Sequence, residues 1–390
     1  MLIKIMKKIL IYSILTYLLF TINSNASNQS LEAKNLRIGI LVPLSGPFQE
    51  MGQSFLKAIQ LALFDIGNKK IKIYPKDSQG NALNSYLAAK EFEELGIEIV
   101  IGPVFFESLE RLNEIKNITF ISLTNKTQNI PKNTIAFGIN IKSQLNTLIK
   151  YFNKIQLSKT LLLSPKSQYI DQANIFKGSS IKFNKKFLYD SNPKKITGEI
   201  EKLTKYYERK KDLKRRILIL EKSDLYKDKS ELKILEQKHT LGEVDFDSVI
   251  VLDFGERLKS ILTSFMFSDV SNKVVKFFTI NQWFDETLFN ESAAQNLHFP
   301  AINFENYKKF ERKYFKTYKE KPNEVAILAY DALGLIYYCW YNNKQQFTPE
   351  QLNNKDGFKG IHGEFFIENN LSIQKLKVYK ISKKKFIKVY

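Results

Sequence analysis

The sequence predicts an α/β protein of two lobes, each built around a mostly parallel, doubly wound sheet. Apolar strand-like runs alternate with amphipathic helical segments along most of the chain, as is typical of parallel sheets covered by helices on both faces. The chain has 390 residues, and about 364 remain once an N-terminal leader of 26 is set aside. That length exceeds what a single core usually organises, which indicates two lobes.

Residues 1–26 are predicted to form a cleavable secretory signal. Lysines precede an apolar core of 14 residues, 9–22, and Ser24-Asn25-Ala26 forms a small-x-small cleavage site. The apolar core is shorter than the roughly 18 to 20 residues that a helix needs to cross a bilayer. No cysteine directly follows the cleavage site, so we expect no lipid anchor and a periplasmic protein without a transmembrane segment.

The first lobe is predicted from four strand and helix alternations. The opening strand, residues 36–44, leads into a helix whose apolar side chains recur every three or four positions, and Gly67 can supply the left-handed residue that ends it. Further strands are expected at residues 70–77, 97–103 and 118–124, with helices at 83–95 and from Ser108.

A second series of the same kind follows along the chain. Strands are expected at residues 133–139, 160–165, 185–190, 245–253 and 273–280, with helices at 144–155, 171–177 and 256–267. Residues 200–240 interrupt the pattern with 13 basic and 8 acidic side chains. We expect a solvated helix with a charged loop there; a docking surface is the functional alternative.

The C-terminal part begins with two long helices, at residues 304–319 and 324–342, the second nearly apolar and therefore predicted to be buried. It contains Cys339, the only cysteine, which we expect to be a buried thiol. Alternating strands around an Asn-Asn turn then predict an antiparallel end to the chain.

The formal net charge of +20 does not indicate a nucleic-acid-binding protein. Of the 60 basic residues, 53 are lysine and seven are arginine, whereas base readout and bidentate phosphate contacts favour arginine. A weak attraction to anionic envelope polymers or lipid headgroups is compatible with this charge.

The sequence offers little for catalysis or metal binding. The three histidines are scattered, and the chain contains no GxSxG elbow, no GxxxxGK[ST] phosphate loop and no GxGxxG motif. We therefore expect no enzyme activity, no metal site and no cofactor.

Four segments resemble, in order, the type I periplasmic binding proteins, the branched-chain amino-acid-binding class. They are "ILVPLSGPFQEMGQSFLKAIQLAL", "IVIGPVFFESLE", "LAYDALGLI" and "FKGIHGEFFIENN". The resemblance implies two α/β lobes joined by three hinge crossings of the chain and closing on a ligand. The expected boundaries are residues 36–140 plus 282–345 for lobe 1, and residues 141–281 plus 346–390 for lobe 2.

Within this fold, the segments "LALFDIGNKKIKIYPKDSQG", "DFDSVIVLDFGERLKSI" and "GFKGIHGEFFIENNLSIQKLKVYKI" resemble the penicillin-binding-protein activator group, exported proteins that stimulate peptidoglycan synthases. Transport receptors bind the ammonium group of an amino acid with a carboxylate on lobe 2, where this chain has Asn281-Gln282-Trp283. The resemblance implies a non-catalytic, activator-like regulator with a peptidoglycan synthase as partner. The alternative is the substrate-binding protein of an ABC transporter, with a permease partner and an amino acid or other small polar solute as ligand.

The candidate ligand-binding residues are those expected at the carboxyl ends of strands, where ligands of open parallel sheets bind. At the Ser45-Gly46-Pro47 turn, ligand binding and a purely structural link are both open. For Trp283 a core position is the alternative role, and for Tyr169 a solvated turn. The full set of candidates is Ser45, Gly46, Ser108, Thr124, Asn125, Tyr169, Asp253 and Trp283.

Overall fold

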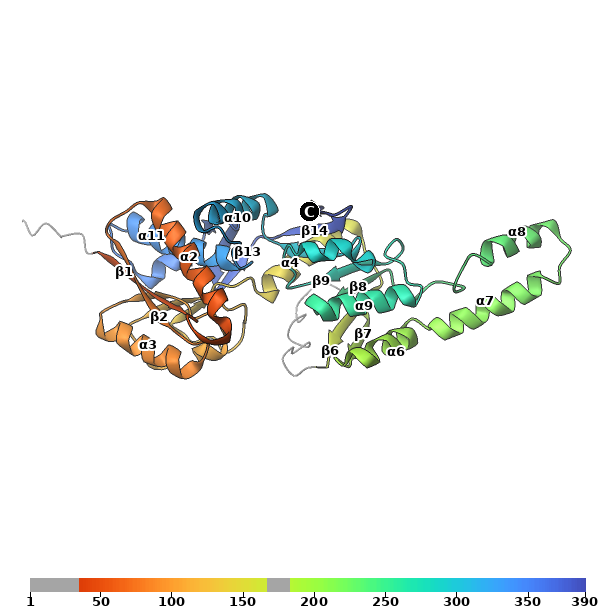
Figure 1. Ribbon diagram of the computed structural model, residues 1–390, viewed down its shortest axis with the longest axis horizontal. Coiled ribbons are helices and arrows are strands. Elements are labelled where there is room, and N and C mark those ends of the chain that lie inside the picture. Colours follow the sequence, from red (N-terminus) through yellow and green to blue (C-terminus); the bar gives the residue numbers. More distant parts are fainter. Residues whose placement is uncertain (1–34, 167–182) are drawn as a thin grey trace, which may run out of the picture.

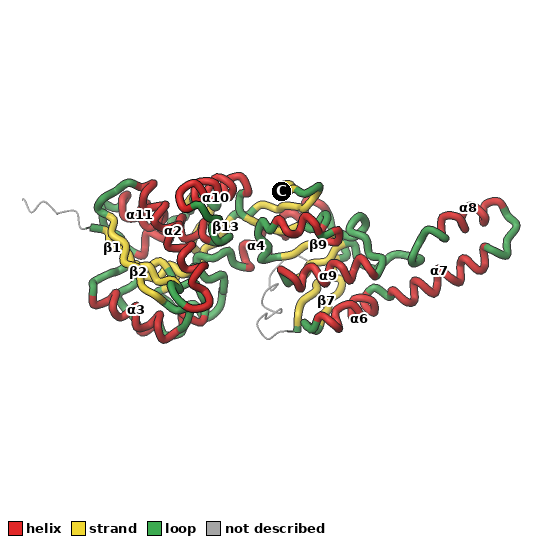
Figure 2. Tube along the Cα trace, viewed as in Figure 1, coloured by secondary structure: helices red, strands yellow, loops and turns green. Residues whose placement is uncertain are grey.

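The computed structural model describes residues 35–166 and 183–390. The predicted signal segment 1–26, the predicted helix at 171–177 and the candidate residue Tyr169 lie outside the described residues. Two lobes lie side by side along the longest axis of the molecule, and a helical arm extends from one of them (Figure 1). Each lobe contains one twisted sheet with helices around it (Figure 2).

Lobe 1 is built on an eight-stranded sheet in the order β11-β12-β13-β5-β4-β3-β1-β2. Its first five strands along the chain pair in parallel, whereas β11 to β13 pair with one another antiparallel. The strands are β1 (Leu36–Val42), β2 (Ile71–Asp77), β3 (Ile99–Ile101), β4 (Thr119–Ser122), β5 (Thr134–Ala136), β11 (Phe358–Lys359), β12 (Glu364–Glu368) and β13 (Leu371–Gln374).

The helices of lobe 1 are α2 (Gln49–Ile66), α3 (Ala82–Glu94), α10 (Phe304–Tyr318) and α11 (Ala326–Asn342). Helix α2 packs along α11, which is almost entirely apolar and carries the buried Cys339. Gly67 ends α2 in the left-handed conformation, with φ 64° and its N–H bonded to the carbonyl of Leu63, as the sequence predicts.

Lobe 2 is built on a seven-stranded sheet in the order β15-β14-β10-β9-β8-β6-β7. Its strands are β6 (Thr160–Pro165), β7 (Phe183–Tyr189), β8 (Ser248–Val251), β9 (Lys276–Thr279), β10 (His298–Ala301), β14 (Lys377–Ser382) and β15 (Lys385–Lys388). Its helices are α4 (Ile141–Ile155), α6 (Pro193–Leu203) and α9 (Gly255–Phe267). The parallel strands β6, β8 and β9 are buried, as near-continuous apolar runs predict.

Residues 206–235 form the arm, which consists of α7 (Tyr206–Leu220) and α8 (Tyr226–Leu235) joined by a short loop. The two helices lie side by side and project from lobe 2 on the side away from lobe 1 (Figure 1). The predicted solvated helix is therefore a helical hairpin.

The chain crosses between the lobes three times, but two crossings lie later than expected. The first lies between β5 and α4, close to the predicted boundary at 140. Strand β10 continues the parallel order of lobe 2, so residues 282–301 are not part of lobe 1 and the second crossing follows Ala301. The third follows β13, because β11 to β13 extend the sheet of lobe 1 and only β14 and β15 return to lobe 2.

Two of these crossings are joined by a buried polar network. Asn140 caps α4 by accepting from the N–H of Ser143 at 2.9 Å, and its amide donates to the carbonyl of Ser372 at 2.5 Å. Ser143 bonds the side chain of Gln374 at 2.8 Å, and the Gln374 amide reaches the carbonyls of Phe137 and Gly138 at 3.2 Å. These hydrogen bonds therefore tie the first and third crossings to each other.

Two local predictions were wrong. Ser108 does not start an α-helix: it lies in a short 3-10 turn, Glu107–Leu109, followed by a second one at Leu112–Glu114. Strand β10 was not predicted, because four residues containing Pro300 give little strand signal.

Candidate functional site

The opening turn of lobe 1 is organised around Asp77, at the carboxyl end of β2. Ser45 Oγ donates to Asp77 Oδ2 at 2.5 Å, and the backbone N–H groups of Leu44 and Gln79 donate to Oδ1 at 2.7 and 2.8 Å. Burial opposes ionisation of the Asp77 carboxyl, but these hydrogen bonds, led by that from Ser45, hold its pKa below the usual value. The hydroxyl of Ser45 is thus already engaged within the chain.

The same turn is covered by aromatic side chains. Gly46 takes φ 76°, which turns the chain into α2. The ring of Phe48 lies 4.5 Å from that of Phe105 between centroids, and both rings lie against Gly80. Apolar contact therefore closes the space over the strand ends at this corner.

The remaining lobe 1 candidates do not form one cluster of available polar groups. Ser108 is buried, and its Oγ has no hydrogen-bond partner among the described residues. Thr124 is also buried and accepts from the N–H of Lys126 at 3.3 Å, while Asn125 is exposed. Ser122, which was not a candidate, ties β4 to the next loop by donating to the carbonyl of Pro103 at 2.7 Å.

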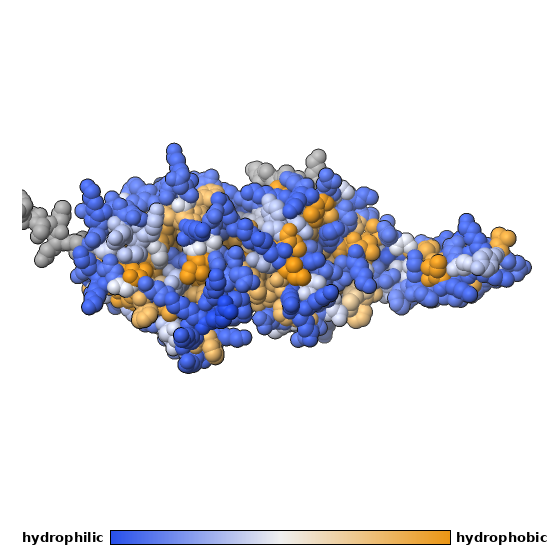
Figure 3. Space-filling view, turned by 90° about the horizontal axis from the view of Figure 1, so that it is seen from above, coloured by the Kyte–Doolittle hydropathy of each residue, from blue (hydrophilic) through white to orange (hydrophobic). Residues whose placement is uncertain are grey.

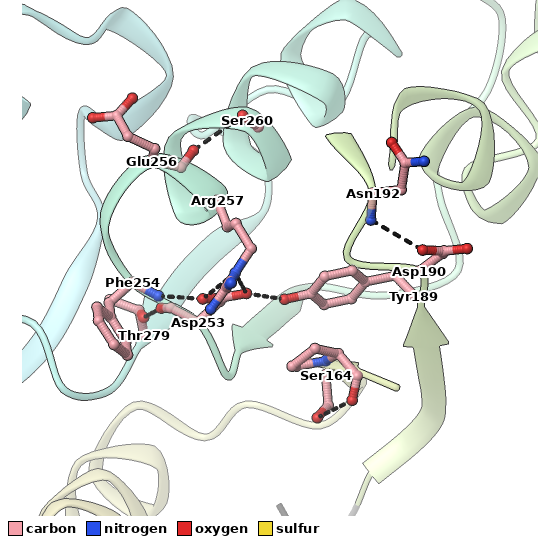
Figure 4. A network of polar contacts seen from close by, with 11 residues as sticks. Ser164, Tyr189, Asp190, Asn192, Asp253, Phe254, Glu256, Arg257, Ser260 and Thr279 are labelled. Carbon is pink, nitrogen blue, oxygen red and sulfur yellow. Dashed lines mark hydrogen bonds and ion pairs between the residues drawn. The ribbon is translucent and has the colours of Figure 1, made fainter. Parts of the chain in front are cut away.

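On lobe 2 the structure places Asp253 at the centre of a polar network (Figure 4). It follows β8, and its side chain is only 2% exposed. Arg257 Nε lies 2.9 and 3.1 Å from the two carboxylate oxygens, the N–H of Phe254 donates to Oδ1 at 2.9 Å, and the Tyr189 hydroxyl donates to Oδ2. Thr279, at the end of β9, donates to the backbone carbonyl of Asp253 at 2.6 Å.

Contact with Asp253 contributes to the pKa shifts of the two side chains that bind it, Arg257 and Tyr189. Hydrogen bonding and attraction to Asp253 raise the pKa of the Arg257 guanidinium. Burial, followed by the hydrogen bond to the carboxylate, raises the pKa of Tyr189. The Asp-x-x-x-Arg spacing across the start of α9 could have indicated the ion pair from sequence, whereas Tyr189 comes from β7, far along the chain.

Trp283 follows β9 in the chain, four residues after Thr279 of this network, and its side chain is not fully exposed. Its side chain is half-buried and packs against the main core. Asn281, two residues earlier, takes φ 57° and exchanges hydrogen bonds of 2.6 and 2.7 Å with Gln144 of α4. The amide-rich segment thus fixes α4 to lobe 2.

Among the described candidates, Ser45, Thr124 and Asp253 lie at the carboxyl edges of the two sheets, and their side chains are bonded within the chain. A depression of about 440 Å³ lies elsewhere, at the amino ends of β3 to β5, and none of the candidates lines it. Over residues 35–166 and 183–390 no group of three possible metal ligands occurs. Within the same ranges, no helix combines the length and the hydropathy that crossing a membrane requires.

Comparisons with known proteins agree with this architecture. The sequence model of a family described as periplasmic binding protein matches residues 35–173. No curated protein sequence matches significantly.

Three solved structures illustrate the similarity, each aligned over 91% of this chain. One is the branched-chain amino acid transporter substrate binding protein LivJ from Streptococcus pneumoniae, in complex with isoleucine, at 15% identity, 99% of that chain and a TM-score of 0.56. Another is the C-domain of LpoA from Haemophilus influenzae, a regulator of PBP1A, at 14% identity, 100% of that chain and a TM-score of 0.58. The third, assigned as a branched-chain amino acid ABC transporter from Rhodospirillum rubrum, has 13% identity, 99% coverage and a TM-score of 0.68.

These neighbours are binding or regulatory proteins, and identities of this size establish the fold rather than the ligand. With two helix-flanked, mostly parallel sheets and three crossings between them, this chain has the two-lobed fold of the type I periplasmic binding proteins.

Proposed function

We propose that this protein is an exported, non-catalytic regulator of peptidoglycan synthesis that acts by contact with a peptidoglycan synthase. The observation that carries the proposal is the internal ion pair of Asp253. This carboxylate lies at the edge of lobe 2 where a solute would be bound, but Arg257 and Tyr189 already occupy both of its oxygens.

An amino acid enclosed between two lobes needs a partner for its ammonium group, because a buried cation without one is costly. Asp253 could serve only by giving up one of these partners: Arg257, whose side chain is half exposed, or the hydroxyl of Tyr189, which is fully buried and would lose its acceptor. On lobe 1, Ser45 is similarly engaged by Asp77. Sheet edges whose polar side chains are already bonded within the chain favour a role in protein contact over the capture of an amino acid.

Support of a second kind comes from LpoA, described as a regulator of PBP1A, whose C-domain shares the fold along its full length. This chain covers 59% of full-length LpoA. The predicted signal at residues 1–26 would deliver the protein to the periplasm, where synthases of the cell wall act.

The test is an in-cell crosslink of the tagged protein, followed by mass spectrometry of the captured partners. The proposal predicts enrichment of a bifunctional peptidoglycan synthase over a tagged control protein carrying the same signal. Enrichment of an ABC permease instead, with no synthase, would contradict the proposal.

The alternative is solute capture for an ABC importer. It is favoured by Trp283, a half-buried aromatic ring in the segment after β9, where aromatic contact would suit a small ligand. A thermal-shift screen of amino acids and small polar solutes separates the two functions, since a ligand at a hundred times its Kd stabilises the folded state by about 2.7 kcal/mol. Our proposal expects no shift of this size, and the Trp283→Ala variant serves as the control for a ligand that does produce one.

A further inference from the structure

The arm is anchored at its base by a buried arginine. Arg209, in the first turn of α7, is only 8% exposed. Its guanidinium donates to the carbonyl of Thr204 at 3.0 Å, to Thr240 Oγ1 at 3.0 Å, and to the carbonyls of Ser268 and Gly242 at 2.6 and 3.4 Å. One side chain therefore joins both ends of the arm to the loop after α9, so the arm has a fixed direction.

The two helices of the arm also hold each other. Leu213, Leu220 and Leu235 form a small core between them. Arg216 makes a bidentate ion pair across the hairpin with Glu231, at 2.9 and 2.8 Å. This arrangement leaves the outer faces of the hairpin free for other contacts.

Large apolar side chains gather at the distal end, where nothing in the described chain covers them. Leu218 and Ile219, in the last turn of α7, are 58% and 55% exposed; Leu225 and Tyr226, at the start of α8, are 67% and 87% exposed. These four residues, termed the tip cluster below, surround the turn that joins the helices. Apolar side chains are visible on the narrow arm in the space-filling view (Figure 3).

The arm as a whole carries a net positive charge. Residues 205–240 contain 12 lysines and arginines against 7 aspartates and glutamates, a net charge of +5. Lys214 lies one turn before Leu218 in α7, Lys222 lies two residues beyond the end of that helix, and Lys227 follows Tyr226, all three of them exposed. The exposed Glu221 and Asp224 lie in the same turn. The arm thus combines exposed apolar side chains near its end with a net positive charge along its length.

We propose that the tip of this arm binds an anionic lipid bilayer. Four exposed apolar side chains near the end of a projecting arm with a net positive charge fit an anionic bilayer interface, which accepts apolar side chains and attracts cations at the same surface. Leucine and isoleucine would enter the acyl boundary, tyrosine would sit at headgroup level, and the lysines would contact lipid phosphates. This inference goes beyond the regulatory role and does not depend on it.

The first test uses purified protein beginning at Ser27, so that the signal segment cannot contribute, and sedimentation with vesicles. Vesicles of zwitterionic lipid with 30% anionic lipid, about one lipid in three, are compared with vesicles of zwitterionic lipid alone. We expect binding to the anionic vesicles that weakens as salt is raised. The triple variant Lys214→Gln, Lys222→Gln, Lys227→Gln should lower the partition coefficient about a hundredfold.

Matched controls separate the tip from the general positive charge of the protein. Lys69→Gln, Lys72→Gln and Lys321→Gln remove three exposed lysines from lobe 1 and should change binding far less. The double variant Leu225→Ser, Tyr226→Ser should weaken binding about thirtyfold, while Phe64→Ser, at an 81% exposed position on α2, should leave it unchanged.

A second measurement locates the contact. Burial raises the pKa of the Cys339 thiol to about 11, so a polarity-sensitive fluorophore can be attached selectively to Tyr226→Cys. We expect its emission to shift to the blue with anionic vesicles, and the same label on Phe64→Cys to stay unchanged.

Absence of binding to anionic vesicles would overturn the proposal. So would equal losses in the two lysine triples, or vesicle binding with an unchanged label at position 226. Because no synthase is present in these assays, their outcome is independent of the crosslinking result.

Discussion

Replacing Arg209 by methionine should loosen the arm while the lobes stay folded. The variant keeps much of the apolar contact of the side chain but removes the guanidinium from its acceptors. Thr204 and Ser268 are fully buried residues, so their carbonyls lose their donor without access to water, whereas the bond to the exposed Gly242 is long and replaceable by solvent.

The expected loss follows from those two carbonyls. Each buried carbonyl left without a donor costs about 1–3 kcal/mol. For the two carbonyls together we expect the arm to lose about 3 kcal/mol of stability, because methionine retains part of the apolar packing of arginine. If the loss is confined to the arm, amide hydrogen exchange in residues 206–235 should become about 150-fold faster, and exchange in β8 and β9 should not change.

Hydrogen exchange read by mass spectrometry measures this directly. Arg215→Met is the matched control, because Arg215 is exposed on the same helix and pairs only at the surface with Asp212, a contact that contributes about 0.5 kcal/mol. Arg209→Lys should restore little, since one ammonium group cannot reach all the acceptors of a planar guanidinium. Equal exchange in the Arg209→Met and Arg215→Met arms would refute the anchoring role.

Two further predictions concern the lobes. Gly52→Ala in α2 should lower the free energy of unfolding by about 3 kcal/mol or more, because a Cβ there would lie 1.7 Å from the carbonyl oxygen of Pro43; urea denaturation measures the loss, and a stable variant would show that α2 can move away from the strand end. Burial in lobe 2 lowers the pKa of His298 to about 4, from a usual value of 6.5. The unfolded chain therefore binds more protons between these values, and the contribution of this group to stability is complete above pH 6.5 and is lost as the pH falls toward 4. His298 should therefore lower the free energy of unfolding at pH 5 by about 2 kcal/mol relative to pH 7. The His298→Phe variant should lose this part of the pH dependence, whereas His239→Gln, at an exposed position, should keep it. Equal pH profiles of unfolding for the two variants would count against the prediction.

Much of the fold could be predicted from local pattern. Strand β1 and helix α2 follow from an apolar run, a helical apolar stripe and Gly67, all within 32 consecutive residues. The turn Asn369-Asn370, where both residues take positive φ, closes the hairpin of β12 and β13 as expected.

Sheet membership could not be read in the same way. The strand β10 pairs with β9 and β14, which are separated from it by different lengths of chain, and its own four residues give no periodic signal. The C-terminal strands look continuous in sequence, but the bend between Gln374 and Lys377 sends them to different sheets. Pairings of this range are decided by tertiary packing rather than by the segment itself.

In the candidate site, too, positions along the chain could be predicted from sequence, whereas contacts between distant segments could not. Sequence placed Ser45 and Asp253 correctly at the carboxyl ends of their strands, since that follows from order along the chain. It did not reveal that Asp77 and Tyr189 would engage them, because each partner comes from another strand of the same sheet. The chemical availability of a residue depends on such partners, and so the role of the site changed once they were known.

The polar network at the crossings has a mechanical consequence. Asn140, Ser143 and Gln374 are fully or nearly fully buried, so rotating one lobe against the other would break their hydrogen bonds out of reach of water. Helix α7, with 15 residues, adds a rod of about 22 Å beyond lobe 2. A force applied at its far end would therefore reach these crossings through lobe 2, where the buried hydrogen bonds oppose rotation of lobe 2 against lobe 1.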